Sequence, residues 1–101
     1  MNIEEADTLA AMRNAMPRLA YFELDQNHRG LLAPGLIDFM PLLNEAARLG
    51  FAGIVGVEAF SRFNLAEDHA DALAIWRNTF EDGDRLALQS RDLIQRAFGS
   101  P

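Results

Sequence analysis

Two short apolar stretches decide the fold of this chain: residues 19–24, LAYFEL, and residues 54–58, IVGVE. Each is too short for a helix and rich in aliphatic or aromatic side chains, which predicts a β-strand. Between them, residues 38–49 place leucines and alanines at helical spacing, with Asp38 as the expected N-cap and Gly50 as the expected stop. A strand, a helix and a second strand in this order form a crossover, so the two strands are expected to be adjacent and parallel.

Helices are also expected on both sides of this crossover. Asn2 and Glu5 have the spacing of a capping box, and the apolar pattern after them predicts a helix over residues 3–14. Two more helices are predicted over residues 66–80 and 84–98. The order of elements is then αβαβαα, which is an α/β fold. Because parallel strands normally belong to sheets of more than two strands, the pattern indicates part of a larger sheet.

The composition describes a single domain over residues 1–101 and excludes several classes of protein. Of the residues, 50% are hydrophobic and 24% are charged, and no apolar run is long enough to cross a membrane. The start MNIEEAD lacks the basic and apolar parts of a signal peptide, so a cytoplasmic location is expected. Without cysteine there is neither a disulfide nor a thiolate zinc site. The net charge of -6 argues against binding to nucleic acid or to an anionic membrane.

A glutamate stands at the end of each predicted strand. Glu23 is the penultimate residue of the first strand, and Glu58 is the last residue of the second. Parallel strands bring their carboxyl ends to one edge of the sheet, where such folds place ligands and catalytic groups. Two carboxylates there could bind a hard divalent cation or accept a proton from a carbon next to a carbonyl group. The alternative is that each is a solvated acid. Side-chain alternation places Tyr21 on the face of Glu23, and Phe22 and Leu24 on the face toward the helices.

The loop DQNHRG, residues 25–30, follows the first strand. It does not match a calcium-binding loop, because Arg29 occupies a ligand position and the twelfth position carries leucine in place of glutamate. His28 and Arg29 could polarise a substrate oxygen or bind a carboxylate or phosphate group. The alternative is a surface turn shaped by Asn27 and Gly30.

Two other conspicuous side chains are expected to be structural. His69 lies among acidic residues at a predicted helix start, which is typical of a solvated face. Trp76 is expected to pack against the fold, because no basic residues are interleaved with it as in a platform for nucleic-acid bases.

Several motifs in this order resemble a known family. The segment NHRG is followed by PG-x-IDF and then by the run G-F-x-G-x-x-x-V-E-x-F. Together with MNIEEAD and a late WR, they resemble the C-terminal part of the xylose-isomerase-like TIM barrels, over almost the whole chain. The likeness is closer to the sugar isomerase and epimerase branch that includes D-tagatose 3-epimerase-like proteins. The resemblance implies part of a (β/α)8 barrel that holds one divalent cation, manganese, magnesium or cobalt.

The resemblance also implies roles for particular residues. In this family two glutamates move a proton at a carbon next to a ketone, through an enediolate. Glu58 matches one of them, which is also a metal ligand, and Arg29 matches the arginine that contacts substrate oxygens. Glu23 stands where the family has a histidine metal ligand, so the metal ligands of this chain would all be carboxylates, which favours harder ions.

The family motif around MNIEE follows the sixth strand of the barrel, and the other metal ligands come earlier still. Two carboxylates cannot complete an octahedral site, so this chain alone is expected to bind a metal weakly or not at all. The expected function is the C-terminal part of a metal-dependent sugar isomerase or epimerase, acting on a ketose or hydroxy-carbonyl compound and inactive as the isolated chain. The alternative is a non-catalytic assembly module whose open strand edges are completed by another copy, as a homo-oligomer, or by another chain.

Overall fold

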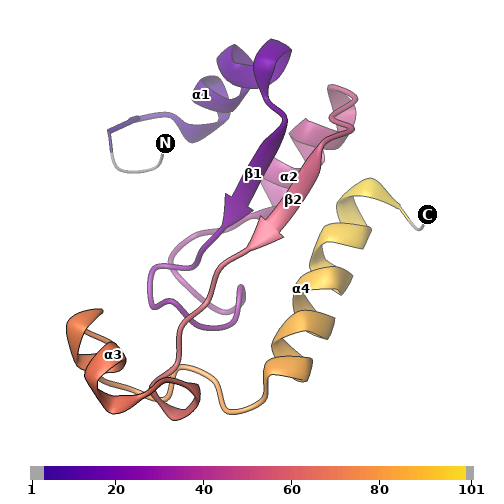
Figure 1. Ribbon diagram of the computed structural model, residues 1–101. Helices are drawn as coiled ribbons and strands as arrows, with labels where there is room; N and C mark the ends of the chain where they lie inside the picture. The colour runs from indigo at the N-terminus through magenta and orange to yellow at the C-terminus, as the bar shows by residue number, and fades with distance from the viewer. Residues whose placement is uncertain (1–3, 100–101) are drawn as a thin grey trace.

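The expected order of elements is confirmed by a computed structural model that describes residues 4–99. The main elements are α1 (Thr8–Ala15), β1 (Tyr21–Leu24), α2 (Met40–Arg48), β2 (Ile54–Val57), α3 (Glu67–Ala72) and α4 (Gly83–Phe98). Two short 3-10 turns, η1 (Met16–Arg18) and η2 (Arg62–Asn64), follow α1 and β2. Figure 1 shows α2 and α4 along one side of the two strands, with α3 apart from them beyond the strand ends. None of the helices within residues 4–99 is long and apolar enough to span a membrane.

β1 and β2 are adjacent and parallel, as predicted. Tyr21 pairs with Ile54 and Glu23 with Gly56 in the register of the sheet. Beyond the paired residues, the amide of Glu58 donates to the carbonyl oxygen of Leu24 at 3.0 Å. Glu58 therefore continues the strand direction of β2 and is held beside the end of β1.

The core lies between the sheet and its helices. It is built on four buried apolar side chains, Leu24, Leu32, Phe39 and Leu43, against which Phe22, Val55, Val57, Leu93, Ile94 and Phe98 pack. Phe22 and Leu24 thus face the helices, as side-chain alternation predicted. On the other face of the sheet, Tyr21 is 48% exposed and Ile54 is 67% exposed. This second face is the one that carries Glu23.

The first helix begins later than predicted. Residues 4–6 are not helical, and α1 starts at Thr8 with Asp7 as its N-cap. The Asp7 carboxylate accepts a hydrogen bond from the Ala10 amide at 3.0 Å, which satisfies one of the free amides of the first turn. Asn2, half of the expected capping box, lies outside the described residues. At α2 the helix begins at Met40, and Asp38 accepts from the Met40 amide at 3.1 Å although Phe39 takes the cap position.

The predicted helix over residues 66–80 is wrong in its second half, because α3 ends at Ala72. The Ala74 amide donates to the Asp71 carbonyl at 3.1 Å, and the Ile75 amide donates to the Ala70 carbonyl at 2.8 Å. These two bonds form a Schellman motif, which turns the chain back on itself and buries Ile75 to 3% exposure. The backbone of Ala74 is left-handed, with φ of 56°.

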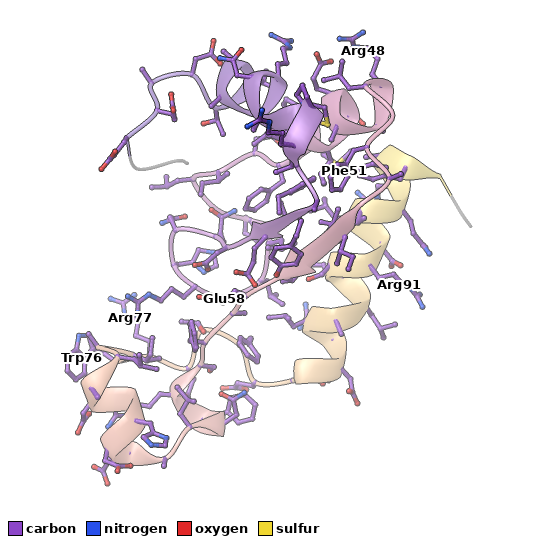
Figure 2. The ribbon with its side chains drawn as sticks, turned by 45° about the horizontal axis from the view of Figure 1, so that its top comes forward. Arg48, Phe51, Glu58, Trp76, Arg77 and Arg91 are labelled. Carbon is purple, nitrogen blue, oxygen red and sulfur yellow. The ribbon has the colours of Figure 1, made fainter. Side chains whose placement is uncertain are left out.

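The early end of α3 also overturns the expectation for Trp76. Downstream of the turn this side chain is 67% exposed, so most of it lies outside the packing of residues 4–99. Figure 2 shows Trp76 and Arg77 beside α3, away from the sheet. His69 is exposed on α3, as expected.

The same motif ends α2, with glycine at the left-handed position. Gly50 has φ of 78°, and its amide donates to the Ala47 carbonyl at 3.0 Å.

We expect Gly50→Ala to lower the free energy of unfolding by about 1 kcal/mol, since a Cβ disfavours this backbone conformation. An added Cβ would meet nothing within 4 Å, so packing should not contribute. Ala74→Gly should raise stability by a similar amount. Urea unfolding of the two variants checks this, and changes of the same sign would contradict it.

An ion-pair network joins α1 to α2. Glu45 accepts from Arg13 at 2.6 Å and from Arg48 at 2.7 Å. The hydrogen bonds from Arg48 and then Arg13 lower the pKa of Glu45 from 4.5 to about 2. A folded-state pKa below the unfolded value stabilises the fold above that unfolded value, and the stabilisation is lost as the pH falls toward the folded pKa.

The wild-type chain should therefore lose stability more steeply than Glu45→Gln as the pH falls from 4.5 toward about 2. Urea midpoints measured across this range test the effect. Parallel pH profiles for the two proteins would show that the network does not couple folding to protonation.

Candidate functional site

The carboxyl ends of β1 and β2 form a rim that carries two glutamates. Glu23 is exposed and lies opposite Gly56, while Glu58 is half-buried and follows β2 directly. Figure 2 shows Glu58 at this end of the sheet. Partial burial raises the pKa of the Glu58 carboxyl, and the charges of Glu23 and Asp25 raise it further, while Arg29 lowers it. The structure therefore brings Glu23 and Glu58 together, as their positions at the strand ends predicted.

Asp25 adds a third carboxylate beside them. Burial raises its pKa, with a smaller contribution from Glu23, while the charge of Arg29 acts in the opposite direction. Its Oδ1 atom is buried and has no hydrogen-bond partner among residues 4–99. Even so, residues 4–99 contain no cluster of three or more His, Cys, Asp or Glu side chains arranged to hold a metal ion. Within these residues, the carboxylates of the rim therefore do not make up a metal site on their own.

Tyr21 belongs to the same rim, and sequence reasoning did not assign it a role. Its hydroxyl donates a hydrogen bond to Glu23 Oε1 at 2.7 Å. This bond is the main cause of a raised pKa for the Tyr21 hydroxyl. The tyrosine hydroxyl lies over Gly56, at a place that the Cβ of any other residue would occupy. The signal was present in the sequence: Tyr21 shares a face with Glu23, and a glycine stands in the neighbouring strand.

Arg29 lies in the loop after β1, where backbone and side-chain contacts hold it. Its backbone is left-handed, with φ of 64°. Its carbonyl oxygen accepts from the Phe60 amide at 2.8 Å, just beyond β2. Its Nη1 donates to the Leu73 carbonyl at 2.7 Å. Since its charge lowers the pKa of both Asp25 and Glu58, the guanidinium lies within electrostatic reach of the acids.

The contacts of His28 favour the surface turn over a substrate contact. Its Nδ1 accepts from the Gly30 amide at 3.1 Å, so the ring proton lies on Nε2, which donates to the Pro34 carbonyl at 2.8 Å. Asn27 also holds the loop, accepting from the Leu36 amide at 2.9 Å. Both ring nitrogens of His28 are engaged by the backbone.

A buried glutamine fixes the loop that carries Arg29. Gln26 is 1% exposed. Its amide group donates to the Leu32 carbonyl at 2.8 Å and to the Ile37 carbonyl at 2.9 Å. Its side-chain oxygen accepts from the Asn27 and Ile37 amides, each at 3.0 Å. Gly35 lies so close to this side chain that a Cβ there would overlap it. The sequence alone gave no reason to separate Gln26 from the other polar loop residues.

The chain resembles known proteins in sequence and in fold. No family model matches the chain. The chain is 37% identical over 94 residues to an L-ribulose 3-epimerase of Mesorhizobium japonicum, with 93% of the chain covered, and 34% identical over 95 residues to a ketose 3-epimerase of Arthrobacter globiformis, with 94% covered. Its fold superposes with a TM-score of 0.82, at 30% identity over 96% of the chain, on a D-allulose 3-epimerase from Methylomonas sp. solved in complex with D-allulose.

These matches cover little of the other proteins. The chain spans about a third of the relatives' length: 32% and 33% of the two sequences and 34% of the solved structure. The expected resemblance is nevertheless confirmed, both in sequence and in fold. The chain is homologous to a C-terminal part of the TIM-barrel ketose 3-epimerases.

Proposed function

We propose that this chain supplies the C-terminal rim of a divalent-metal-dependent ketose 3-epimerase and acts when the rest of a barrel completes the site. The observation that carries the proposal is the meeting of Glu23 and Glu58 at one edge of the parallel strands, with Arg29 beside them. The substrate class is a small ketose, because the relatives are named as epimerases of L-ribulose and of ketoses.

The acids of the rim suit a hard cation in part. The charge of Glu23 raises the pKa of both Asp25 and Glu58, and Asp25 raises that of Glu58 further, which indicates negative charge that a cation would neutralise. Glu58 and Glu23 are the two residues that would hold it, and further ligands must come from elsewhere, since residues 4–99 contain no complete cluster. A bound divalent ion would polarise the carbonyl oxygen of the ketose and stabilise charge developing on it.

The side chains of the rim divide the remaining work. Glu58 would take the proton from the carbon next to the ketone, and the raised pKa of its carboxyl brings its proton affinity closer to neutral pH. Arg29 would donate to substrate oxygens, because its planar fork carries several N–H groups. Tyr21 would keep Glu23 in one rotamer through its hydroxyl.

A grafted enzyme tests this function. Residues 4–99 would replace the matching third of the Mesorhizobium japonicum L-ribulose 3-epimerase, and epimerisation of L-ribulose at C3 would be followed by chromatography. We expect activity from the graft, and a loss of about a hundredfold or more in kcat for Glu58→Gln, as for removal of an acid-base catalyst.

Glu81→Gln is the matched control for this graft, since Glu81 is an exposed acid outside the rim. Its kcat should equal that of the parent graft. A graft that unfolds cooperatively but shows no turnover, or a Glu58→Gln graft as active as its parent, would contradict the proposal.

A second candidate function is an assembly module without catalysis. Within residues 4–99 the sheet has two strands, so one edge of each strand is unpaired. A groove of about 890 Å³ runs beside β1, and its apolar lining includes Met12 of α1, Phe22 of β1, and Ile37 and Phe39 just before α2. Open strand edges next to a groove that is partly apolar favour association with another copy. Sedimentation velocity would show concentration-dependent oligomers in that case, and a monomer throughout the micromolar range would contradict it.

A further inference from the structure

The segment between β2 and α4, residues 59–81, has no part in the chemistry described above. We call it the α3 excursion, because it contains η2 and α3 and projects beyond the strand ends (Figure 1). It is held together internally by Arg62, whose Nη1 forms an ion pair with Asp71 at 2.8 Å and donates a hydrogen bond to the Ile75 carbonyl at 3.0 Å. The Arg62 amide also donates to the Arg77 carbonyl at 3.0 Å. The α3 excursion is therefore a cross-linked unit and not a loose loop.

This unit contacts Arg29 at two points. The Schellman turn at Ala74 ends α3 and leaves the Leu73 carbonyl without a partner inside the helix. Arg29 Nη1 donates to that carbonyl at 2.7 Å, across 44 residues of sequence. The Phe60 amide, at the start of the excursion, donates to the Arg29 carbonyl at 2.8 Å. Both the side chain and the backbone of Arg29 are thus fixed by the same unit.

The contact with Leu73 determines the orientation of the Arg29 guanidinium and which of its N–H groups are free. Within the described part of the chain Arg29 has no carboxylate at ion-pair distance, although its charge reaches Asp25 and Glu58. An untethered arginine next to these acids would turn toward them, because a charge-assisted pair is favourable. The Leu73 carbonyl engages one of five N–H donors and leaves the others free.

We propose that the α3 excursion is a positioning element, which holds the Arg29 guanidinium away from the acids of the rim and aims its free N–H groups at the oxygens of a ketose. This inference rests on the proposed function for the identity of the ligand. The hold on Arg29 itself rests on the contacts alone.

The test compares two substitutions at one position, in the chain itself. Ala74→Gly keeps the left-handed turn, whereas Ala74→Pro cannot adopt φ of 56° and loses the amide that bonds to Asp71. Nitrogen-15 NMR of the arginine side chains reports rotation of each guanidinium. In the wild type and in Ala74→Gly, the guanidinium of Arg29 should rotate slowly, so that its two Nη atoms give separate signals. In Ala74→Pro it should rotate fast, so that the two signals merge into one.

Arg91 is the internal reference, because it is exposed on α4 and its contact is to the neighbouring Asp92 at 3.4 Å. Its signals should be averaged in all three proteins. Arg62→Met is a second route to the same result, since it removes the contacts of Arg62 with Asp71 and Ile75 and leaves Arg29, Leu73 and Ala74 unsubstituted. Two results would overturn the inference. One is a guanidinium of Arg29 that rotates as fast as that of Arg91 in the wild type, and the other is an Arg29 whose signals are unchanged in both Ala74→Pro and Arg62→Met.

The grafted enzyme separates this result from the proposed function. In the graft, Ala74→Pro should raise KM for L-ribulose by about tenfold while Ala74→Gly leaves it unchanged, as for loss of one oriented hydrogen-bond donor. An ordered Arg29 in the chain together with an inactive graft would contradict the proposed function alone. A mobile Arg29 would overturn the inference whatever the graft does.

Discussion

Replacement of Gln26 by methionine should lower the free energy of unfolding by about 4 kcal/mol, because it removes the partners of several buried or part-buried backbone groups at once. Methionine fills nearly the same volume, so the loss comes from hydrogen bonding and not from a cavity. The Leu32 and Ile37 carbonyls would each lose a donor, and the Asn27 and Ile37 amides would each lose an acceptor. Water cannot readily replace them, since the site of Gln26 is 1% exposed.

Gln89→Met is the matched control for this prediction. Gln89 makes one hydrogen bond, from its amide to the Ala33 carbonyl at 3.1 Å, in the same loop region. Its loss should cost about 1 kcal/mol or less. Urea unfolding followed by circular dichroism measures both variants. Equal losses for Gln26→Met and Gln89→Met would show that the four bonds of Gln26 do not act as a unit.

Gly53→Ala should be nearly as damaging, at about 3 kcal/mol, because it forces β1 and β2 apart. A Cβ at Gly53 would overlap the carbonyl oxygen of Ala20, a backbone atom that accepts from the Ile54 amide at 3.0 Å. Backbone atoms cannot move aside as a flexible side chain can. The strain would fall on the start of the parallel ladder, on which the alignment of Glu23 with Glu58 depends.

Gly83→Ala is expected to change stability in the opposite direction from Gly53→Ala. Gly83 is the first residue of α4, and an added Cβ there would meet nothing within 4 Å. Alanine is the better helix former, so stability should rise by up to about 1 kcal/mol. Thermal unfolding of the two variants checks the pair. A Gly53→Ala protein as stable as the wild type would mean that the strands are not packed as described.

The parallel strands and their acidic ends were predictable from sequence. Short apolar runs separated by a helical segment are sufficient for the crossover, because connections of this kind have one favoured hand. In the structure Glu23 pairs with Gly56, and the charge of Glu23 acts on the nearby Glu58 carboxyl. The roles of these acids in binding and proton transfer remain predictions.

The helix ends were less predictable, because they depend on which group caps them. Asp7 is a good cap by residue type, but so are several other residues near it in the sequence, and only the structure shows that its side chain accepts from the Ala10 amide. The end of α3 at Ala72 coincides with the burial of Ile75, whose amide bonds back to the Ala70 carbonyl, a tertiary gain that helical spacing does not show. Gly50 indicated in the sequence where α2 ends, because glycine favours the left-handed conformation. The alanine at the corresponding position of α3, Ala74, gives no such signal.

Two residues that shape the site carried no conventional motif. The hydrogen bond from Tyr21 to Glu23 requires a glycine opposite, which becomes meaningful only when the register of the strands is known. Gln26 is one polar residue in a polar loop, and its burial follows from how residues 32–37 fold back over it. In both cases the missing information was spatial.

The measurement that tests the account most directly is the effect of manganese(II) on the amide NMR spectrum of the chain. Weak binding of this paramagnetic ion broadens signals near its site. If the carboxyl ends of β1 and β2 form one oxygen-rich site, broadening should centre on Glu23, Asp25 and Glu58, and Glu58→Gln should weaken it. Broadening centred on the equally acidic start of α3, at Glu67 and Asp68, or broadening that Glu58→Gln leaves unchanged, would contradict the account.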